Sequence, residues 1–426
     1  MTARTALPLV AFVLSVSLAG NFAAGEPAPG DVFREYMWYD EKGDAGGALR
    51  VGGKQGETLP DRGWAHDYIN APVVLNHDFD LNQATKAEVV IEKILCHDGT
   101  KGLAIQINGH DWIEVPEAAR IPVPQWEYQH HIYPTLPVPL DWLKPGRANE
   151  FRMRVSPEHS WQWPQNLIYG VHFRIYYDRA KRSHPTGAMT SPKSGTTIGQ
   201  SVALACKAQS PGGRITQVDY VAHCEDVNFE GDGEYRRWHY HFFHGKILHH
   251  LGSATTPPFT VRWDTSWVPD QDQPLKLAAR ITDESGMIYV TDAVEDVKLV
   301  RPGLSVELCK PYNVPKQWVT RKGKKEETLD VRGDLSRAVA AQLVWHSWCP
   351  GYMTGLYIND KKVFENEGPR YQYYAHRVTL NDLSAFRKGA NTLATGPSQK
   401  NQHGMEVNWP GIMVLIQYRD LETPDK

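Results

Sequence analysis

The sequence is poor in cysteine, lacks an amphipathic helix of ordinary length, and contains none of the common catalytic signatures. Only 5 of its 426 residues are Cys, whereas 29 Pro and 35 Gly interrupt the chain at short intervals. A G-x-S-x-G elbow, a phosphate-binding loop, a dinucleotide fingerprint and an H-E-x-x-H pair are all absent, which excludes the usual hydrolase, nucleotide-binding and metalloprotease interpretations. The formal net charge of −3 favours neither nucleic acid nor an anionic membrane as a partner.

Long apolar runs are absent beyond the N-terminus. Residues 1–25 combine Arg4, an apolar run from Ala6 to Gly20, and small residues up to the end of the segment. This is the pattern of a secretory signal peptide, with cleavage after Ala24 or Gly25. The apolar run is too short for a comfortable membrane span, and no other stretch approaches the roughly 20 apolar residues required. We therefore expect a secreted or periplasmic protein without membrane insertion.

The sequence does contain strand periodicity. Apolar residues alternate with arginines over 151–155 and with polar residues over 171–177, which is the period of a half-buried strand. Over 412–416 both alternating sets are apolar, so a neighbouring domain should cover that strand on its second face. The predicted fold class is all-β.

The two ends of the chain repeat each other. An Asn turn at Ile107–Gly109 precedes a second Asn at Asn149, and the same order recurs at Ile358–Asp360 and Asn391. The spacing from the second Asn to a closing Asp is identical in the two copies, and a His precedes each Asn turn at similar range: Asp178 and His97, Asp420 and His346. A fixed order of such features indicates a duplicated domain.

The paired motifs resemble the galactose-binding-like jelly roll, a sandwich found in glycoside hydrolases and carbohydrate-binding modules. The residues that carry the resemblance are Gln106–Gly109 with Leu143–Asn149 in the first copy, and Tyr357–Asp360 with Lys388–Asn391 in the second. Asp360 stands where the pattern prefers Gly, so the second turn is expected to differ in type. The middle segment, with Trp263–Trp267 before a strand, looks like the immunoglobulin-like spacers of bacterial secreted proteins.

The predicted architecture is therefore two jelly-roll β-sandwiches separated by an immunoglobulin-like β-sandwich. The middle segment is a series of short strands and turns of the kind such a sandwich contains, predicted at 201–208, 215–222, 259–263, 275–282, 288–291 and 294–299. The predicted boundaries are a signal peptide at 1–25, jelly rolls at 31–178 and 304–420, a linker at 179–190, and the immunoglobulin-like domain at 191–300.

Aromatic and polar residues near the repeat ends are the candidate ligand contacts. Indole rings stack on the apolar faces of sugars, although a buried Trp in a sandwich core is an equally ordinary role. The binding candidates are Trp161, Trp163, Trp348, Trp409, His97, His346 and Asn408. Glu406 and His403 lie in the densest polar and aromatic segment and are the catalytic candidates, although no second carboxylate can be assigned for glycoside hydrolysis.

Two patterns suggest metals. Asp226, Asn228 and Glu230 place oxygens as in the first half of a calcium loop, but Arg237 stands where an EF-hand needs Glu. Calcium therefore remains only a possible structural ion. The pair His130-His131 and the spacing His239-x-His241, taken with Met405, are similar to the ligands of two-domain copper monooxygenases. Because His239 and His241 lie outside both repeats, copper is not expected, and no cofactor is required.

The cysteines allow at most two internal disulfides. Cys206 and Cys224 lie in neighbouring predicted strands, and Cys309 and Cys349 both lie in the last repeat. These are the predicted pairs, which leaves Cys96 as the odd residue, buried as a small hydrophobe.

These features predict a secreted carbohydrate-binding protein that recognises a polysaccharide or glycoconjugate. Two repeats on one chain make bivalent binding natural. One alternative is a carbohydrate-active enzyme, such as a glycosidase, polysaccharide lyase or deglycosylase, with its site between the jelly rolls. The other is a structural surface protein whose Trp residues are all buried. A deep cleft with titratable groups of perturbed pKa would favour the enzyme.

Overall fold

The computed structural model is all-β, as predicted, and its sheets form sandwiches. It describes residues 26–39, 49–52, 72–95, 101–155, 165–321, 323–365, 368–397 and 403–419. The predicted signal peptide and Cys96, His97, Trp161 and Trp163 lie outside the described residues. Among the described residues, no helix has the length and apolar character needed to cross a bilayer.

The first sandwich consists of two antiparallel layers. One layer has the order β1-β10-β4, with β7 and β8 both paired to β4 and β2 paired to β10; the other has the order β3-β9-β5-β6. The strands are β1 (Val32–Tyr39), β2 (Leu49–Gly52), β3 (Val73–Val74), β4 (Ala84–Leu95), β5 (Ala104–Ile107), β6 (Trp112–Glu114), β7 (His130–Ile132), β8 (Thr135–Val138), β9 (Glu150–Arg154) and β10 (Gln165–Tyr177), with short 3-10 turns η2 (Gln125–Glu127) and η3 (Leu140–Trp142).

The last sandwich repeats this order. Its layers are β23-β32-β26-β29 and β24-β25-β30-β27-β28, and β31 pairs with β26. The elements are β23 (Leu304–Cys309), β24 (Pro311–Tyr312), β25 (Lys325–Val331), η4 (Leu335–Arg337), β26 (Ala338–Trp348), η5 (Pro350–Tyr352), β27 (Leu356–Ile358), β28 (Lys361–Phe364), β29 (Tyr373–Leu380), β30 (Gly389–Thr395), β31 (Glu406–Val407) and β32 (Met413–Arg419).

The same pair of asparagines braces both sandwiches. Asn108 donates from Nδ2 to Asn149 Oδ1 at 2.9 Å, and Asn359 donates to Asn391 Oδ1 at 2.7 Å. The second Asn of each pair also accepts from the backbone N–H that opens its loop, at 2.8 Å from Lys144 and at 2.9 Å in the later copy. Because each brace joins two loops and a strand start, the repeated motif fixes backbone geometry.

The two Asn turns have the same backbone type. The φ angles are 49° and 79° at Asn108 and Gly109, and 48° and 65° at Asn359 and Asp360. Positive φ at both central residues defines a type I′ hairpin turn. The expectation of a different turn at Asp360 was therefore wrong, because Asp tolerates the left-handed region.

The middle sandwich shares a sheet with the first. Backbone pairing of β21 with β1, at Tyr289 and Val32, joins the sheets of the two sandwiches into one 13-stranded sheet. The elements are β11 (Thr186–Ser191), β12 (Thr197–Ile198), β13 (Ser201–Gln209), β14 (Ile215–Glu225), β15 (Arg236–Trp238), β16 (His241–Phe243), β17 (Lys246–Leu248), β18 (Gly252–Ala254), β19 (Thr260–Asp264), β20 (Leu275–Asp283), β21 (Met287–Val290) and β22 (Val294–Leu299). Strand β11 begins inside the segment predicted as a linker.

The predicted disulfides are not formed, because Cys206, Cys224, Cys309 and Cys349 are buried free thiols. Cys309 of β23 pairs with Val414 of β32, and Val414 pairs with Leu343 of β26. Leu343 lies six residues before Cys349. At about 3.3 Å per residue, the last two cysteines lie roughly 20 Å apart along the strand, well beyond the roughly 7 Å Cα limit for a disulfide.

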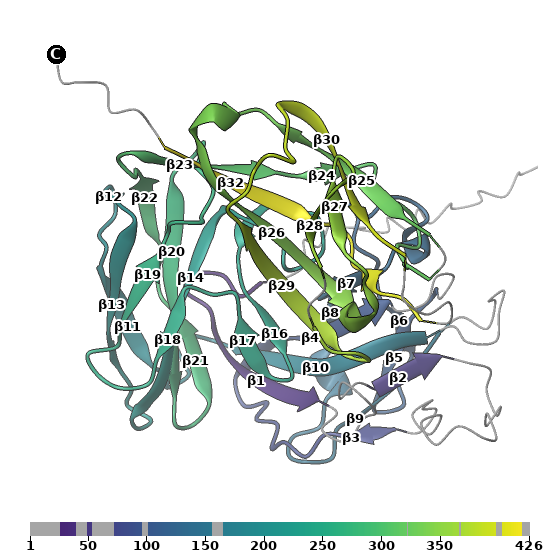
Figure 1. The fold of residues 1–426 in the computed structure, drawn as a ribbon. Helices are drawn as coiled ribbons and strands as arrows, with labels where there is room; N and C mark the ends of the chain where they lie inside the picture. The colour runs from purple at the N-terminus through teal and green to yellow at the C-terminus, as the bar shows by residue number, and fades with distance from the viewer. Residues whose placement is uncertain are drawn as a thin grey trace, which may run out of the picture.

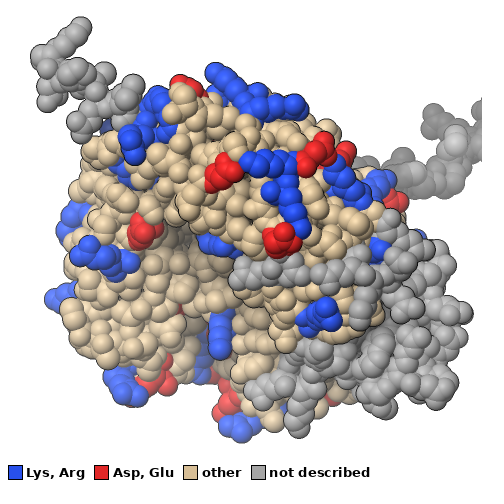
Figure 2. Space-filling view, viewed as in Figure 1, with Lys and Arg blue, Asp and Glu red and all other residues tan. Residues whose placement is uncertain are grey.

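The sandwiches pack into one body, and charge is mixed over its surface. Figure 1 shows β32 and β26 of the last sandwich above β10 and β4 of the first, with β16 and β17 beside them. Acidic and basic side chains are interspersed on the face seen in Figure 2. A group of buried His, Tyr and Glu side chains lies inside instead, where the three sandwiches meet.

Candidate functional site

The site lies between the outer faces of β4 and β26. On β4, Val89 and Ile91 point into the core of the first sandwich, so the alternation of a strand turns Glu92 and Ile94 outward. On β26, Leu343 and Trp345 face the last core. The residues between and after them face outward, Val344 toward the middle sandwich and Trp348 toward the first. We call the region where these outer faces meet the middle sandwich the junction.

The junction is closed on one side by the middle sandwich. Val227 and Phe229 pack with Val344, Met413 and Leu415 of the last sandwich. This contact confirms that a neighbouring part of the chain covers the second apolar face of the strand predicted at 412–416. The loop from 226 to 235 is thus wedged between the other two parts.

Imidazoles from all three parts of the chain meet in the junction. The ring centroid of His131 lies 6.4 Å from that of His241 and 6.2 Å from that of His346, which are themselves 5.9 Å apart. The three side chains come from β7, β16 and β26 and are 0%, 3% and 6% exposed. His249 stacks on His241 at 4.7 Å.

Two tyrosines adjoin these imidazoles. Tyr373 meets the His131 ring edge-on at 4.5 Å and the His346 ring at 5.0 Å. Tyr133 lies 4.9 Å from His131 and 5.1 Å from His241. The His131 ring therefore directly contacts both imidazoles, which can accept a proton, and tyrosine hydroxyls, which can donate one.

Glu92 adds a buried carboxyl group. Its side chain is 1% exposed, and Oε1 lies 3.5 Å from His131 Nε2. Its position matches that of His346. Val89 pairs with the residue four before Tyr177, and Leu343 pairs with the residue four before Tyr418. Glu92 and His346 each lie three residues after that paired position. Glu92 is therefore the structural counterpart of His346, and the predicted match of His97 with His346 falls on a residue outside the described ranges.

Burial keeps these groups uncharged. Desolvation lowers the pKa of His241 to about 3, with Arg237 and His239 adding to the effect. Desolvation also lowers the pKa of His131 and His346 well below the usual value. The same cause raises the pKa of Glu92, Tyr133 and Tyr373 well above their usual values. At neutral pH the imidazoles therefore stay neutral and the tyrosines keep their protons, while burial favours the protonated form of Glu92.

Several polar atoms in the junction lack a hydrogen-bond partner among the described residues. They include both ring nitrogens of His241, Nε2 of His346, and the hydroxyls of Tyr133 and Tyr373. Unpaired buried polar atoms are rare because each costs about 1–3 kcal/mol. Their concentration at one place is typical of a functional site rather than of a packed interface.

The adjacent histidines of β7 face opposite ways because successive strand residues alternate. His131 enters the junction, whereas His130 lies 3.3 Å from Glu117, which also accepts from the buried Lys93 at 2.7 Å. Met405 belongs to the last core. The His pair and the Met therefore do not converge with His239 and His241 as the copper pattern requires.

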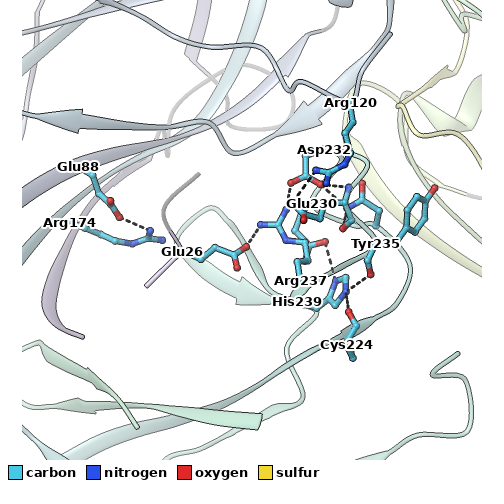
Figure 3. Close-up of polar contacts among 12 residues, drawn as sticks. Glu26, Glu88, Arg120, Arg174, Cys224, Glu230, Asp232, Tyr235, Arg237 and His239 are labelled. Carbon is cyan, nitrogen blue, oxygen red and sulfur yellow. Dashed lines mark hydrogen bonds and ion pairs between the residues drawn. The ribbon is translucent and has the colours of Figure 1, made fainter. Parts of the chain in front are cut away.

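The predicted calcium residues bond to the protein itself. Asn228 donates to Asp232 Oδ1 at 3.0 Å, and Asp226 accepts from the next backbone N–H. Glu230 lies 3.3 Å from His239 Nδ1, and Figure 3 shows His239 also facing the carbonyls of Cys224 and Tyr235. In the part of the chain that the structure describes, no group of three or more His, Cys, Asp or Glu is arranged to hold a metal ion.

The other predicted site residues gather at the rim of the junction. Trp348 is 9% exposed and packs with Tyr373. The backbone N–H of Asn408 donates to the His346 carbonyl at 3.0 Å, and that of Trp409 donates to Gln129 at 2.7 Å. Trp348 therefore lines the interface instead of forming an open platform, and ligand contact by these residues stays a prediction.

The two predicted catalytic residues lie at separate places on this rim. Glu406 faces Trp348 in the β31–β26 ladder, and its carboxylate lies 3.4 Å from Arg321. His403 stacks on Tyr352 at 5.0 Å. Their catalytic roles also stay predictions, since neither is a member of the imidazole group.

Sequence reasoning missed Glu92, Tyr133 and Tyr373. One signal was available: Glu92 and Lys93 interrupt an otherwise apolar strand from Val89 to Leu95. A charged pair inside such a run needs partners on both faces of its sheet. The two tyrosines gave no comparable signal, because aromatic residues are ordinary in strands.

Comparisons with known proteins leave the function open. No family model matches the chain, and no curated protein matches it. Similar solved structures include fibronectin(III)-like modules of Clostridium thermocellum CbhA (12% identity, 48% of this chain and 80% of that chain, TM-score 0.19). A beta-porphyranase of glycoside hydrolase family 86 from Bacteroides plebeius has 9% identity, with 67% of this chain and only 44% of that chain covered and a TM-score of 0.22. A DUF4785 family protein from Legionella pneumophila has 11% identity over 92% of this chain and 84% of that chain, with a TM-score of 0.24. At these TM-scores the likenesses carry no argument.

Proposed function

We propose that this protein is an extracytoplasmic carbohydrate-active enzyme that cleaves uronic-acid polysaccharide by β-elimination in the junction. The observation that carries the proposal is the convergence of neutral imidazoles and neutral tyrosines around His131. The carbohydrate part rests on the sequence resemblance of the two outer sandwiches to sugar-binding jelly rolls. The compartment rests on the N-terminal leader pattern.

The chemistry of elimination suits this set of groups. A base removes the proton at C5 of a uronate, the C–H electrons form the C4=C5 double bond, and the C4–O bond breaks. An acid then protonates the departing oxygen, so no cofactor or water is consumed. We assign the base to His131, whose lowered pKa leaves it neutral, and the acid to Tyr373, whose raised pKa keeps its proton.

Glu92 has a positioning role in this scheme. Burial raises its pKa well above the usual value, which favours the protonated form that can donate a hydrogen bond to the substrate carboxylate. Stabilising that carboxylate lowers the energy of the carbanion that forms at C5. A retaining or inverting glycosidase instead needs a pair of carboxyl groups, one of them ionised. A single carboxyl group with a raised pKa, set among imidazoles, therefore suits elimination better than hydrolysis.

Access to the junction requires local opening, because its side chains are buried. The hairpin β16–β17, which carries His241, forms its own two-stranded sheet. A two-stranded hairpin is marginally stable without side-chain packing. Here the packing comes from Phe243, which contacts Tyr169 at 4.9 Å and Tyr373 at 5.3 Å. Phe242 adds packing on the other face, in a cluster with Phe33 and Tyr176. We assign the opening motion to this hairpin.

The direct test is turnover of uronic-acid polymers, followed by the ultraviolet absorbance of the C4=C5 bond. We expect His131→Ala and Tyr373→Phe to lower the rate about 100-fold or more. The exposed His110, which stacks on Trp142 at 4.9 Å within the first sandwich, provides a matched control as His110→Ala. Saturated products, or unchanged rates in both junction variants, would overturn the assignment.

A second candidate is carbohydrate binding without turnover. A groove of about 780 Å³ between the middle and last sandwiches favours it, because the groove is lined by Tyr312, Arg332 and several carboxylates. Tyr312 is 41% exposed and offers a ring for stacking. Polysaccharide binding that Tyr312→Ala abolishes, without product formation, would support this candidate.

A further inference from the structure

A second aromatic group lies at the surface, at the end of the last sandwich. The Tyr352 ring stacks on the His403 ring at 5.0 Å with an interplanar angle of 17°. Tyr371 stands nearly perpendicular to both, at 5.9 Å and 5.7 Å. Tyr352 donates to Tyr371 Oη at 2.8 Å, so the three rings form one connected unit.

The outer member of this unit is available to a ligand. Tyr371 is 42% exposed, whereas Tyr352 is 3% exposed and supports it from below. Arg370 is also exposed, and its guanidinium lies 4.7 Å from the centre of the Tyr352 ring. The unit therefore presents a flat ring and a positive charge side by side.

Tyr371 is held in a strained backbone conformation. Its φ is 57°, a left-handed conformation that costs a bulky residue on the order of 1–2 kcal/mol. Its N–H is directed at Cys349 Sγ at 3.1 Å, and Cys349 itself has a φ of 54°. Strain of this kind persists where surrounding contacts impose it, and it clusters at ligand sites.

The unit adjoins the junction. Tyr373 begins β29 two residues after Tyr371 and faces Trp348, the residue before Cys349, in the β26–β29 ladder. The Tyr373 ring then contacts His131 and His346. Tyr352 and Tyr373 also belong to one buried cluster with Trp348, so the exposed unit and the buried imidazoles share a packed neighbour.

We propose that Tyr371, Tyr352, His403 and Arg370 form a subsite for a negatively charged sugar unit at the mouth of the junction. The apolar face of the sugar stacks on the Tyr371 ring. Arg370 pairs with the carboxylate or sulfate of the same or the next unit, because guanidinium matches such anions in a bidentate manner. The subsite rests on the proposed function, since it binds the polymer that the junction cleaves.

The experiment measures binding of the full mature chain to polygalacturonate, alginate and chondroitin sulfate, with dextran as the neutral polymer, by affinity electrophoresis. We expect Tyr371→Ala to weaken binding of the preferred acidic polymer about tenfold. Arg370→Gln should weaken acidic binding and leave dextran unchanged, and Tyr371→Phe should retain most of the affinity because the ring remains. His110→Ala is the matched control, since its exposed ring stacks on Trp142 in the first sandwich. Tyr312→Ala is measured beside it to detect binding in the groove.

Each outcome decides the proposal. Wild-type affinity in Tyr371→Ala, no preference for acidic over neutral polymer, or no binding at all would overturn the subsite. Loss of binding in Tyr312→Ala alone would place the sugar in the groove and would also overturn it. Binding that depends on Tyr371 without unsaturated products would support the subsite while rejecting elimination, so the two failures are distinguishable. Unfolding temperatures of the variants establish that they fold.

Discussion

The first and last sandwiches have the same strand order and the same asparagine brace, but they differ on the faces that they turn toward each other. Asn149 and Asn391 occupy equivalent places and make equivalent hydrogen bonds. Glu92 and His346 also occupy equivalent places, yet one is a carboxylic acid and the other an imidazole. The backbone-setting residues thus match, while the facing residues are complementary and build one asymmetric site.

The strongest test of the comparison removes the brace from each copy. Asn149→Ala and Asn391→Ala should each lower the free energy of unfolding by about 3 kcal/mol, because several backbone groups and the partner Asn lose their bonds. Both side chains are 0% exposed, so water cannot replace those bonds readily. Denaturant unfolding monitored by intrinsic fluorescence measures the effect.

Equality of the two losses is the informative result. If Asn391→Ala costs about as much as Asn149→Ala, the motif has the same role in both copies. A loss below about 1 kcal/mol in either variant, as expected for an ordinary surface substitution, would contradict that role. Glu150→Ala, which keeps the backbone N–H that donates to Asn108 at 3.0 Å, is the matched control in the first copy.

The fold was accessible to sequence reasoning because its signals are local. The strands predicted at 201–208, 275–282 and 294–299 match β13, β20 and β22 within one residue at each end. Alternation, turn residues and repeated motifs each act over a few positions. The continuous sheet through β21 and β1 was not predicted, since pairing between distant edge strands leaves no local pattern.

The site was only partly accessible for the same physical reason. The sequence placed an alternative enzyme site between the two repeats, with Glu406 and His403 as catalytic candidates, and it named His346 as a binding candidate. It gave no means of bringing His131 and His241 to His346. Those contacts depend on how whole sheets pack against one another, and such packing leaves no repeating pattern in a single sequence. The cysteine pairs failed similarly, because proximity in a predicted domain did not imply proximity in space.

The complementary pair at the junction predicts opposite pH dependences in two variants. The pKa of His346 is lowered by burial, so its neutral state stabilises the fold fully above pH 6.5, and this stability is lost as the pH falls. The pKa of Glu92 is raised, so its contribution is complete below pH 4.5 and is lost as the pH rises. Each effect amounts to about 1 kcal/mol per pH unit within its window.

We therefore compare the unfolding temperature of each variant with that of wild type at two pH values. For His346→Gln, the difference (variant minus wild type) should be more positive at pH 5 than at pH 7.5. Glu92→Gln should show the opposite trend, gaining relative stability at the higher pH. Thermal unfolding across pH 4.5 to 8 measures both curves. Parallel curves for wild type and both variants would mean that neither group is held neutral in the fold, and the proposed acid–base roles would lose their basis.

The smallest expected difference concerns the turns, where the copies differ by Gly109 and Asp360. Both positions have positive φ, and a side chain added at Gly109 meets nothing within 4 Å. Gly109→Ala should therefore cost about 1 kcal/mol from backbone strain alone. Gly109→Asp should cost less, because Asp bonds locally in this conformation. Chemical denaturation resolves the two variants. An equal cost for Ala and Asp would show that the last copy tolerates Asp360 through its contact with Lys324 at 2.7 Å, and not through the turn itself.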